Sequence, residues 1–192
     1  MVSLQKGLEA SYLNPKQARN YLLKDGYIYD DKLSNINSKV YFNPHDKDLL
    51  IAYRGSKNLI NDWLLTDTAI PFGNLKSTKR YKESEKVYNQ AKVKYHVDHP
   101  TLIGHSLGGS LASAVGGTDK NANVISYNKG AGFFGTDTNN KSNEKAYRQS
   151  GDLVSFNNLF NHNKSKTLGA KMDPLSAHNI NNLEKYTIKI HK

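Results

Sequence analysis

Cysteine is absent from the 192-residue sequence, which excludes disulfides, thiolate catalysis and cysteine-ligated metal centres. Long apolar runs are also absent: no segment approaches the roughly 18 consecutive apolar residues of a membrane-spanning helix, and the first residues lack the apolar stretch of a signal peptide. Arginine is scarce beside lysine and asparagine is frequent, which suggests an AT-rich, virus-like genome. We therefore expect a protein that is cytoplasmic or associated with a virion.

The charge balance bears on partners. The chain has 27 Lys and Arg against 17 Asp and Glu, a formal net charge of +10, which would attract nucleic acid, an anionic membrane surface or an acidic protein. There is no recognised nucleic-acid-binding motif and no basic stripe interleaved with aromatic residues, so we expect no nucleic-acid partner. Five lysines between residues 79 and 94 could draw the chain onto anionic lipid. A solvated helix face also accounts for them.

Apolar runs and helix-forming stretches alternate along the chain. We predict helices from Asn14 to near Gly26, at 78–95 and at 107–115, and strands at 40–42, 49–53, 100–103, 124–127, 153–156 and 186–190. This alternation indicates an α/β protein with a largely parallel sheet and helices on both faces. The length predicts a single domain, 1–192, with an N-terminal helical segment, 1–37, packed on it.

The most informative motif is Gly104-His105-Ser106-Leu107-Gly108, which lies between a predicted strand and a predicted helix. In this context Gly-x-Ser-x-Gly is typical of a nucleophile elbow, a strained turn that presents the serine at a helix N-terminus. The elbow glycines Gly104 and Gly108 avoid Cβ atoms where backbones approach closely. His105 precedes the nucleophile, and we expect it to support the structure rather than act in catalysis.

A catalytic serine requires a base and an acid, which follow it in the order Ser, Asp or Glu, His in this architecture. The histidines downstream of Ser106 are His162, His178 and His191. His162 lies in a polar loop and His191 beside the C-terminus, so we predict His178, in a loop ahead of an element, as the base.

Four aspartates downstream of Ser106 are candidates for the acid: Asp119, Asp137, Asp152 and Asp173. Asp119 and Asp137 lie in hydrophilic loops, and Asp173 is too near His178 in sequence to approach it from another strand end. Asp152 follows a strand-like stretch and a glycine turn. We therefore predict Asp152 as the acid, although an ordinary turn carboxylate would have the same sequence environment.

The serine elbow and the predicted acid and base, taken together with an upstream segment, resemble the class 3, fungal-type triacylglycerol lipase family. The segment 50–56 ends in Arg54-Gly55-Ser56, and 62–67 follows with a tryptophan. The resemblance implies an α/β-hydrolase fold and a serine carboxylic-ester hydrolase, a lipase, esterase or phospholipase acting on a lipid ester. It also implies that the backbone N–H groups of Ser56 and Leu107 hold the oxyanion. We expect neither metal nor cofactor.

In this family the segment after Arg-Gly-Ser can form a lid. Here an apolar stripe of Leu59, Ile60, Trp63 and Leu64 predicts a lid or substrate-contacting helix, with a core-facing helix turn as the alternative. The chain departs from the family in lacking Pro-Arg after residues 124–127. Its spacings of 46 residues from Ser106 to Asp152 and 26 from there to His178 leave no room for a large acyl-binding superstructure.

A second function class remains open. The same scaffold could serve as a catalytically weak or inactive lipid- or membrane-binding assembly protein, because a fold does not fix an activity. The intact Ser, Asp, His order favours the enzyme.

Overall fold

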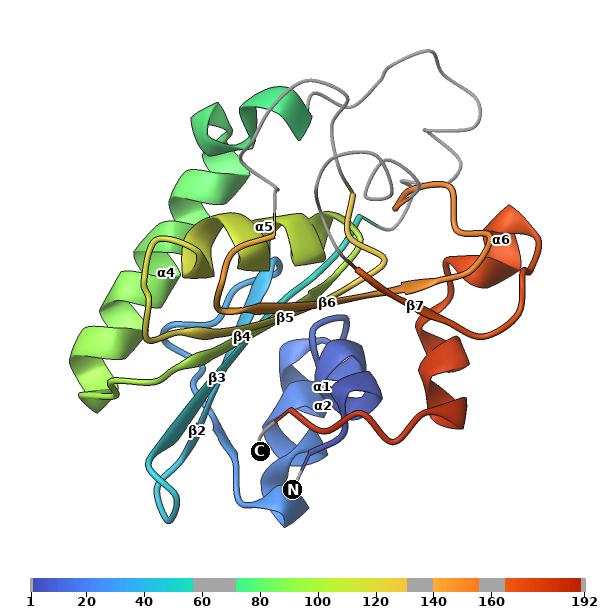
Figure 1. Ribbon diagram of the computed structural model, residues 1–192. Helices are drawn as coiled ribbons and strands as arrows, with labels where there is room; N and C mark the ends of the chain where they lie inside the picture. The colour runs from blue at the N-terminus through green and yellow to red at the C-terminus, as the bar shows by residue number, and fades with distance from the viewer. Residues whose placement is uncertain (1, 57–71, 131–139, 156–164, 191–192) are drawn as a thin grey trace.

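The computed structural model describes residues 2–56, 72–130, 140–155 and 165–190 (Figure 1). Within them one sheet has the order β1-β2-β3-β4-β5-β6-β7. The strands are β1 Ile28–Tyr29, β2 Ser38–Asn43, β3 Asp48–Tyr53, β4 Thr101–His105, β5 Asn123–Tyr127, β6 Glu144–Gln149 and β7 Lys166–Leu168. The pairs β1–β2 and β2–β3 are antiparallel, and every pair from β3 to β7 is parallel. The carboxyl ends of β3 to β7 therefore share one edge of the sheet, which we call the carboxyl edge; the opposite one is the amino edge.

The helices cover both faces of this sheet. The described ones are α1 Leu4–Ala10, α2 Pro15–Tyr21, η1 Leu23–Asp25, η2 Phe72–Ser77, α4 Lys79–Tyr95, α5 Leu107–Gly116, α6 Pro174–Ala177 and η4 Ile180–Lys185. Figure 1 shows α1 and α2 beneath the sheet and α4 and α5 above it. None of the described helices has the length and apolar character needed to cross a membrane.

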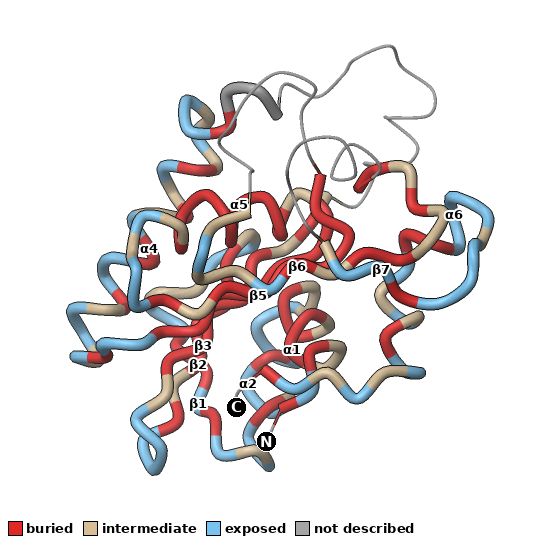
Figure 2. Tube along the Cα trace, in the orientation of Figure 1, coloured by how far each residue is buried: buried red, intermediate tan, exposed pale blue. Residues whose placement is uncertain are grey.

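The alternation of side chains along β3 explains the two layers. Leu50 and Ala52 pack with α1 in one apolar cluster, whereas Leu49, Ile51 and Tyr53 pack with α4 and α5 in the other. Successive strand residues point to opposite faces, so a fully apolar strand is what a sheet covered on both sides requires. Figure 2 shows the resulting buried band through the central strands.

The two upper helices differ in how they meet the sheet. Thr78 caps α4, its hydroxyl accepting the Tyr81 N–H at 3.2 Å. One face of α4 is buried, whereas α5 is buried along nearly its whole length because it consists of small and apolar residues (Figure 2). The structure confirms the predicted strands at 40–42 and 49–53, which form the antiparallel hairpin β2–β3, as well as both of these helices and the strands β4 and β5.

Two predicted strands are wrong. Residues 153–155 form a turn, because the Asp152 carboxylate captures the backbone N–H and hydroxyl of Ser155; the strand here is β6, farther upstream, and Phe156 lies outside the described residues. Residues 186–190 contain only one bridge residue, Lys189, which pairs with Ser3. In both segments the apolar residues indicate burial but not strand pairing.

The N-terminal segment is more complex than predicted. The expected helix from Asn14 is α2 followed by η1, which ends at Gly26 with φ +86°. Neither α1 nor β7 is predicted from the sequence, and residues 1–37 include the edge strand β1 besides helices. α1 lies directly on the sheet: a Cβ at Gly7 would lie 2.6 Å from Ile103 Cδ1.

Candidate active site

Ser106 occupies a strained turn between β4 and α5. Its backbone has φ 56° and ψ −129°, outside the left-handed helical region, and its N–H donates to the carbonyl oxygen of Tyr127 at 3.1 Å. The side chain is buried, and Oγ has no hydrogen-bond partner in the described structure. The turn thus holds a hydroxyl at the carboxyl edge without engaging it in capping α5.

The elbow glycines are required by the close approach of three backbones. A Cβ at Gly104 would collide with the carbonyl of Gly108, and a Cβ at Gly108 would collide with the carbonyl oxygen of Tyr53 at the end of β3. Any side chain at either position would push α5 away from the sheet and move Ser106. The structure therefore gives a steric reason for the Gly-x-Ser-x-Gly spacing.

Asp152 and His178 meet at the same edge. Asp152 follows β6 through Gly151, whose φ is +94°, and His178 is the C-cap residue directly after α6. The Nδ1 of His178 lies 2.7 Å from Oδ1 of Asp152, and both side chains are buried. Because a carboxylate accepts only, Nδ1 carries the proton and donates. Asp152 Oδ2 accepts from the backbone N–H and hydroxyl of Ser155, which fixes the carboxylate.

Other residues set the position of this pair. Asn128, directly after β5, donates from Nδ2 to the carbonyl of Ala177 at 2.9 Å, and its Oδ1 accepts the N–H of Gln149 at 2.7 Å. One amide side chain thereby connects the segment before His178 to the end of β6.

Burial, and then the charge of His178, lower the pKa of the neighbouring His105 ring well below its usual range.

A cavity of about 330 Å³ opens beside His105 and His178. Its lining residues are Tyr12, Ser56, His105, Leu175, His178, Asn179 and Ile180. Ser56 follows β3 and reaches this cavity together with the base predicted from sequence. Leu107 is the first residue of α5, where a backbone N–H has no partner within the helix.

The remaining candidates lie elsewhere. Asp173 is exposed and caps α6, and Asp119 lies at the amino edge bound to Tyr88 and Lys92. The predicted lid residues and three of the rejected candidates lie outside the described residues: Leu59, Ile60, Trp63 and Leu64, and Asp137, His162 and His191. Three further residues at this site, Tyr12, Asn128 and Ser155, are not predicted from the sequence. Of these, only Ser155 has a local signal, an Asp three residues before a Ser, which is typical of a side-chain-capped turn.

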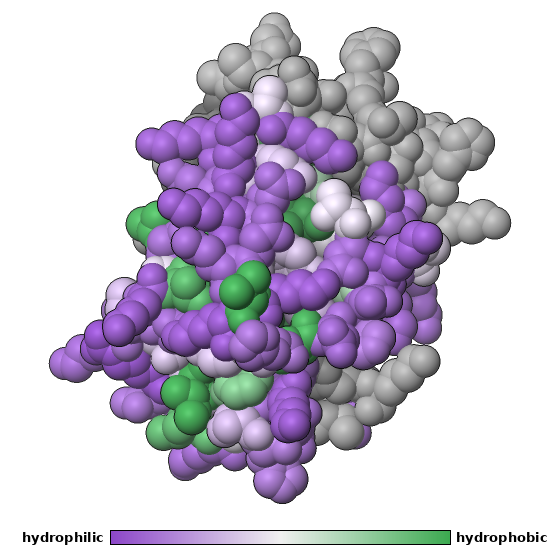
Figure 3. Space-filling model, turned by 90° about the vertical axis from the view of Figure 1, so that its left-hand side faces the viewer, coloured by the Kyte–Doolittle hydropathy of each residue, from purple (hydrophilic) through white to green (hydrophobic). Residues whose placement is uncertain are grey.

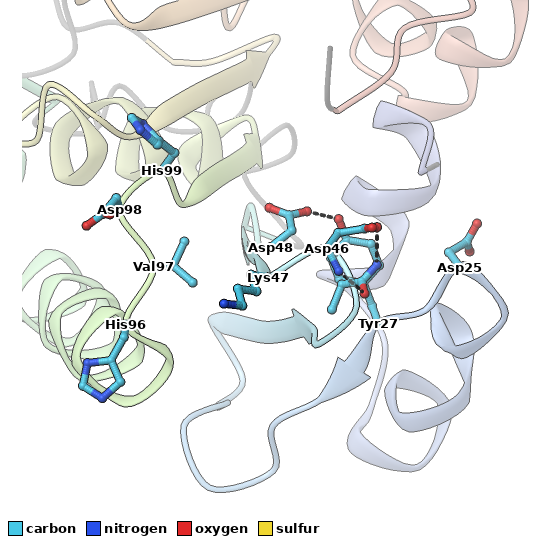
Figure 4. A pocket seen from close by; sticks show the side chains of 10 residues that line it. Asp25, Tyr27, Asp46, Lys47, Asp48, His96, Val97, Asp98 and His99 are labelled. Carbon is cyan, nitrogen blue, oxygen red and sulfur yellow. Dashed lines mark hydrogen bonds between the residues drawn. The ribbon is translucent and has the colours of Figure 1, made fainter.

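A second cavity, of about 640 Å³, lies away from this site at the amino edge (Figure 4). Three of its four carboxylates are engaged locally: Asp48 accepts from Tyr27, Asp46 from Asn43, and Asp25 pairs with Lys6, whereas Asp98 is exposed. In Figure 4 Asp25 and His96 point away from the other side chains, and the described part of the chain has no three His, Asp or Glu placed to hold a metal ion. This cavity carries no comparable chemistry.

A strand-turn-helix serine at the carboxyl edge of a parallel sheet, with a buried Asp–His pair beside it, defines an α/β-hydrolase architecture. Comparison with solved structures shows the same fold. The chain is similar to the Rhizomucor miehei lipase in its propeptide complex (TM-score 0.56, 16% identity, 82% of this chain and 63% of that chain). It is also similar to Lip2 lipase from Yarrowia lipolytica (TM-score 0.53, 13% identity, 91% and 81%).

At these low identities, the chain is similar to the fungal triacylglycerol lipases in its fold. The chain spans less than two thirds of the length of the Rhizomucor chain. No protein-family model and no curated protein matches the sequence.

Proposed function

We propose that this protein is a serine carboxylic-ester hydrolase in which Ser106 is the nucleophile, His178 the base and Asp152 the residue that orients it. The observation that carries the proposal is the buried 2.7 Å hydrogen bond from His178 Nδ1 to Asp152, at the edge where Ser106 is held in a strained turn. A buried carboxylate bound to one imidazole nitrogen leaves the other nitrogen available as a base.

In the proposed reaction these residues act in sequence. His178 Nε2 takes the proton of Ser106 as Oγ attacks the ester carbonyl, and the N–H groups of Ser56 and Leu107 stabilise the oxyanion. The Asp152 carboxylate stabilises the imidazolium that forms. His178 then protonates the leaving alcohol, and water hydrolyses the acyl-enzyme by the same steps.

A lipid ester is the proposed substrate class. Leu175, 53% exposed, and Ile180 give the cavity an apolar rim suited to an acyl chain. Docking on an anionic membrane has less support from α4, because Lys92 pairs with Asp119 and Lys94 with Asp30. The side of the molecule that carries α4 is mostly hydrophilic, with scattered apolar residues (Figure 3).

The test is hydrolysis of p-nitrophenyl esters of several chain lengths by wild type, Ser106→Ala and Ser110→Ala. Ser110 is the matched control: its buried hydroxyl in α5 donates to Gly130 O at 2.7 Å. We expect Ser106→Ala to lose about four orders of magnitude or more in kcat, and Ser110→Ala to stay within about tenfold. Equal rates for wild type and Ser106→Ala, or fluorophosphonate labelling of another serine, would contradict the assignment. Absence of hydrolysis combined with vesicle binding would favour the non-catalytic lipid-binding alternative.

A further inference from the structure

Tyr12 joins three segments that are far apart in the sequence. It follows α1, and its hydroxyl oxygen lies 2.9 Å from His105 Nδ1 and accepts the N–H of Gly55 at 3.2 Å. Residue 55 must be glycine for this arrangement. A Cβ there would lie 2.5 Å from Tyr12 Oη, 2.8 Å from the carbonyl oxygen of His105 and 3.2 Å from Ser106 Cβ. The Tyr12 hydroxyl therefore lies where the segment before Ser56 approaches the nucleophile.

The directions of these hydrogen bonds follow from the groups involved. His105 Nε2 lies 2.8 Å from the carbonyl oxygen of His178, which can only accept, so Nε2 carries a proton. Burial and the charge of His178 lower the pKa of His105 well below its usual range, so the ring is neutral and Nδ1 has no proton. Tyr12 must then donate its hydroxyl proton to Nδ1 while it accepts from Gly55.

The result is a directed chain of three hydrogen bonds: Gly55 N–H to Tyr12, Tyr12 O–H to His105, and His105 Nε2–H to the His178 carbonyl. The His105 and His178 rings also pack against each other, with centroids 4.6 Å apart. This series of hydrogen bonds begins at Gly55, one residue before Ser56, and ends at the backbone carbonyl of His178, the proposed base.

We propose that Tyr12 and His105 are positioning residues of the active site: Tyr12 fixes the Gly55–Ser56 peptide, and His105 fixes His178. The proposal rests on the proposed function, because it assigns these two residues to an oxyanion donor and a base. Neither touches the reacting atoms. Small displacements of such groups lower turnover more than binding, since a misplacement of about 1 Å can cost on the order of 100-fold in rate.

The kinetic test compares Tyr12→Phe with Tyr53→Phe. Tyr53 is the matched control, because its buried hydroxyl likewise donates to a backbone carbonyl, that of Ser84 at 3.3 Å, away from the cavity. We expect Tyr12→Phe to lower kcat at least about tenfold with KM within about twofold, and Tyr53→Phe to leave kcat within about twofold. Equal losses of kcat in the two variants would overturn the proposal.

A spectroscopic test separates this proposal from the proposed activity. In long-range ¹H–¹⁵N spectra of the wild type, His105 should show the Nε2-protonated neutral tautomer. An Nδ1-protonated or doubly protonated ring would contradict the three directed hydrogen bonds and overturn the proposal. Tyr12→Phe should shift the His178 Nδ1–H resonance, and Tyr53→Phe should not. If the wild type hydrolyses no ester, the proposed function fails. The His178 resonance still decides whether the hydrogen bonds of Tyr12 and His105 influence His178, because an unshifted signal in Tyr12→Phe overturns the proposal.

Discussion

At the carboxyl edge of the parallel strands, Ser106 holds a buried hydroxyl that has no hydrogen-bond partner among the described residues, at φ 56° and ψ −129°. At the amino edge, Asp119 accepts hydrogen bonds from Tyr88 and Lys92. Positive φ is not the distinction, since His96 at the amino edge has φ 50° and ψ 47°, an ordinary left-handed helix end. A polar group with partners stabilises the fold, whereas one held in a strained turn without a partner is available for chemistry.

Replacing an aspartate at each edge tests this difference most strongly. Asp152→Asn should lower kcat about 10⁴-fold while the fold is kept, because an asparagine amide can donate to His178 Nδ1 and so favour the wrong tautomer. Ester hydrolysis by purified variants measures it. Asp48→Asn, at the amino edge, should leave kcat within about twofold.

Asp173→Asn is the closer control for the acid. Asp173 lies five residues before His178, but its carboxylate accepts the N–H of Ser176 at 3.0 Å, and asparagine caps a helix equally well. Activity is therefore expected to persist in this variant. If Asp173→Asn abolished hydrolysis and Asp152→Asn did not, the acid would be Asp173.

Local features of the carboxyl edge could be predicted from sequence, and contacts across it could not. The elbow needs only a strand, two glycines and a helix that are contiguous, and the strands that position Asp152 follow in chain order. Tyr12 meets His105 across 93 residues, and no pattern around Tyr12 indicates it. The apolar residues of segment 186–190 predict a strand, but apolar residues indicate only that a segment is buried. Ile190 is buried against Gly7 of α1 rather than within the sheet.

One buried ion pair connects the two edges. It tests whether a charged group stabilises the fold because it has a partner or because of the edge at which it lies. Lys129 follows β5 and reaches Glu144, the first residue of β6, at 2.7 Å, with side chains 1% and 0% exposed. Lys129→Met should lower the free energy of unfolding by about 3–5 kcal/mol, because it leaves a buried carboxylate without its countercharge. Urea unfolding measures the loss.

Lys92→Met is the matched control, since its partner Asp119 lies at the amino edge and the two side chains are 34% and 17% exposed. A surface pair of this kind contributes about 1 kcal/mol or less. Equal losses for the two methionine variants would contradict the distinction. Lys129→Met combined with Glu144→Gln should recover part of the stability, because the unpaired charge is then removed.

The smallest expected effect is the pH dependence of Asp119. Burial raises the pKa of this carboxyl, but hydrogen bonds from Lys92 and Tyr88 outweigh it and lower the pKa to about 2. A carboxyl with a depressed folded-state pKa stabilises the protein above its unfolded pKa of about 3.9, and the contribution is lost as pH falls toward 2. Asp119→Asn should therefore cost on the order of 1 kcal/mol at pH 7, after solvent screening, and converge with wild type near pH 2.

Urea midpoints at pH 7, 4 and 2 measure this convergence, with Asp98→Asn as the control because Asp98 is an exposed aspartate at the same edge. The control should differ from wild type by less than about 0.5 kcal/mol at every pH. Protonation at low pH removes the charge but leaves the packing and the Tyr88 hydroxyl in place. A difference between Asp119→Asn and wild type that stayed constant down to pH 2 would mean that Asp119 stabilises the amino edge through the geometry of its hydrogen bonds rather than through its charge.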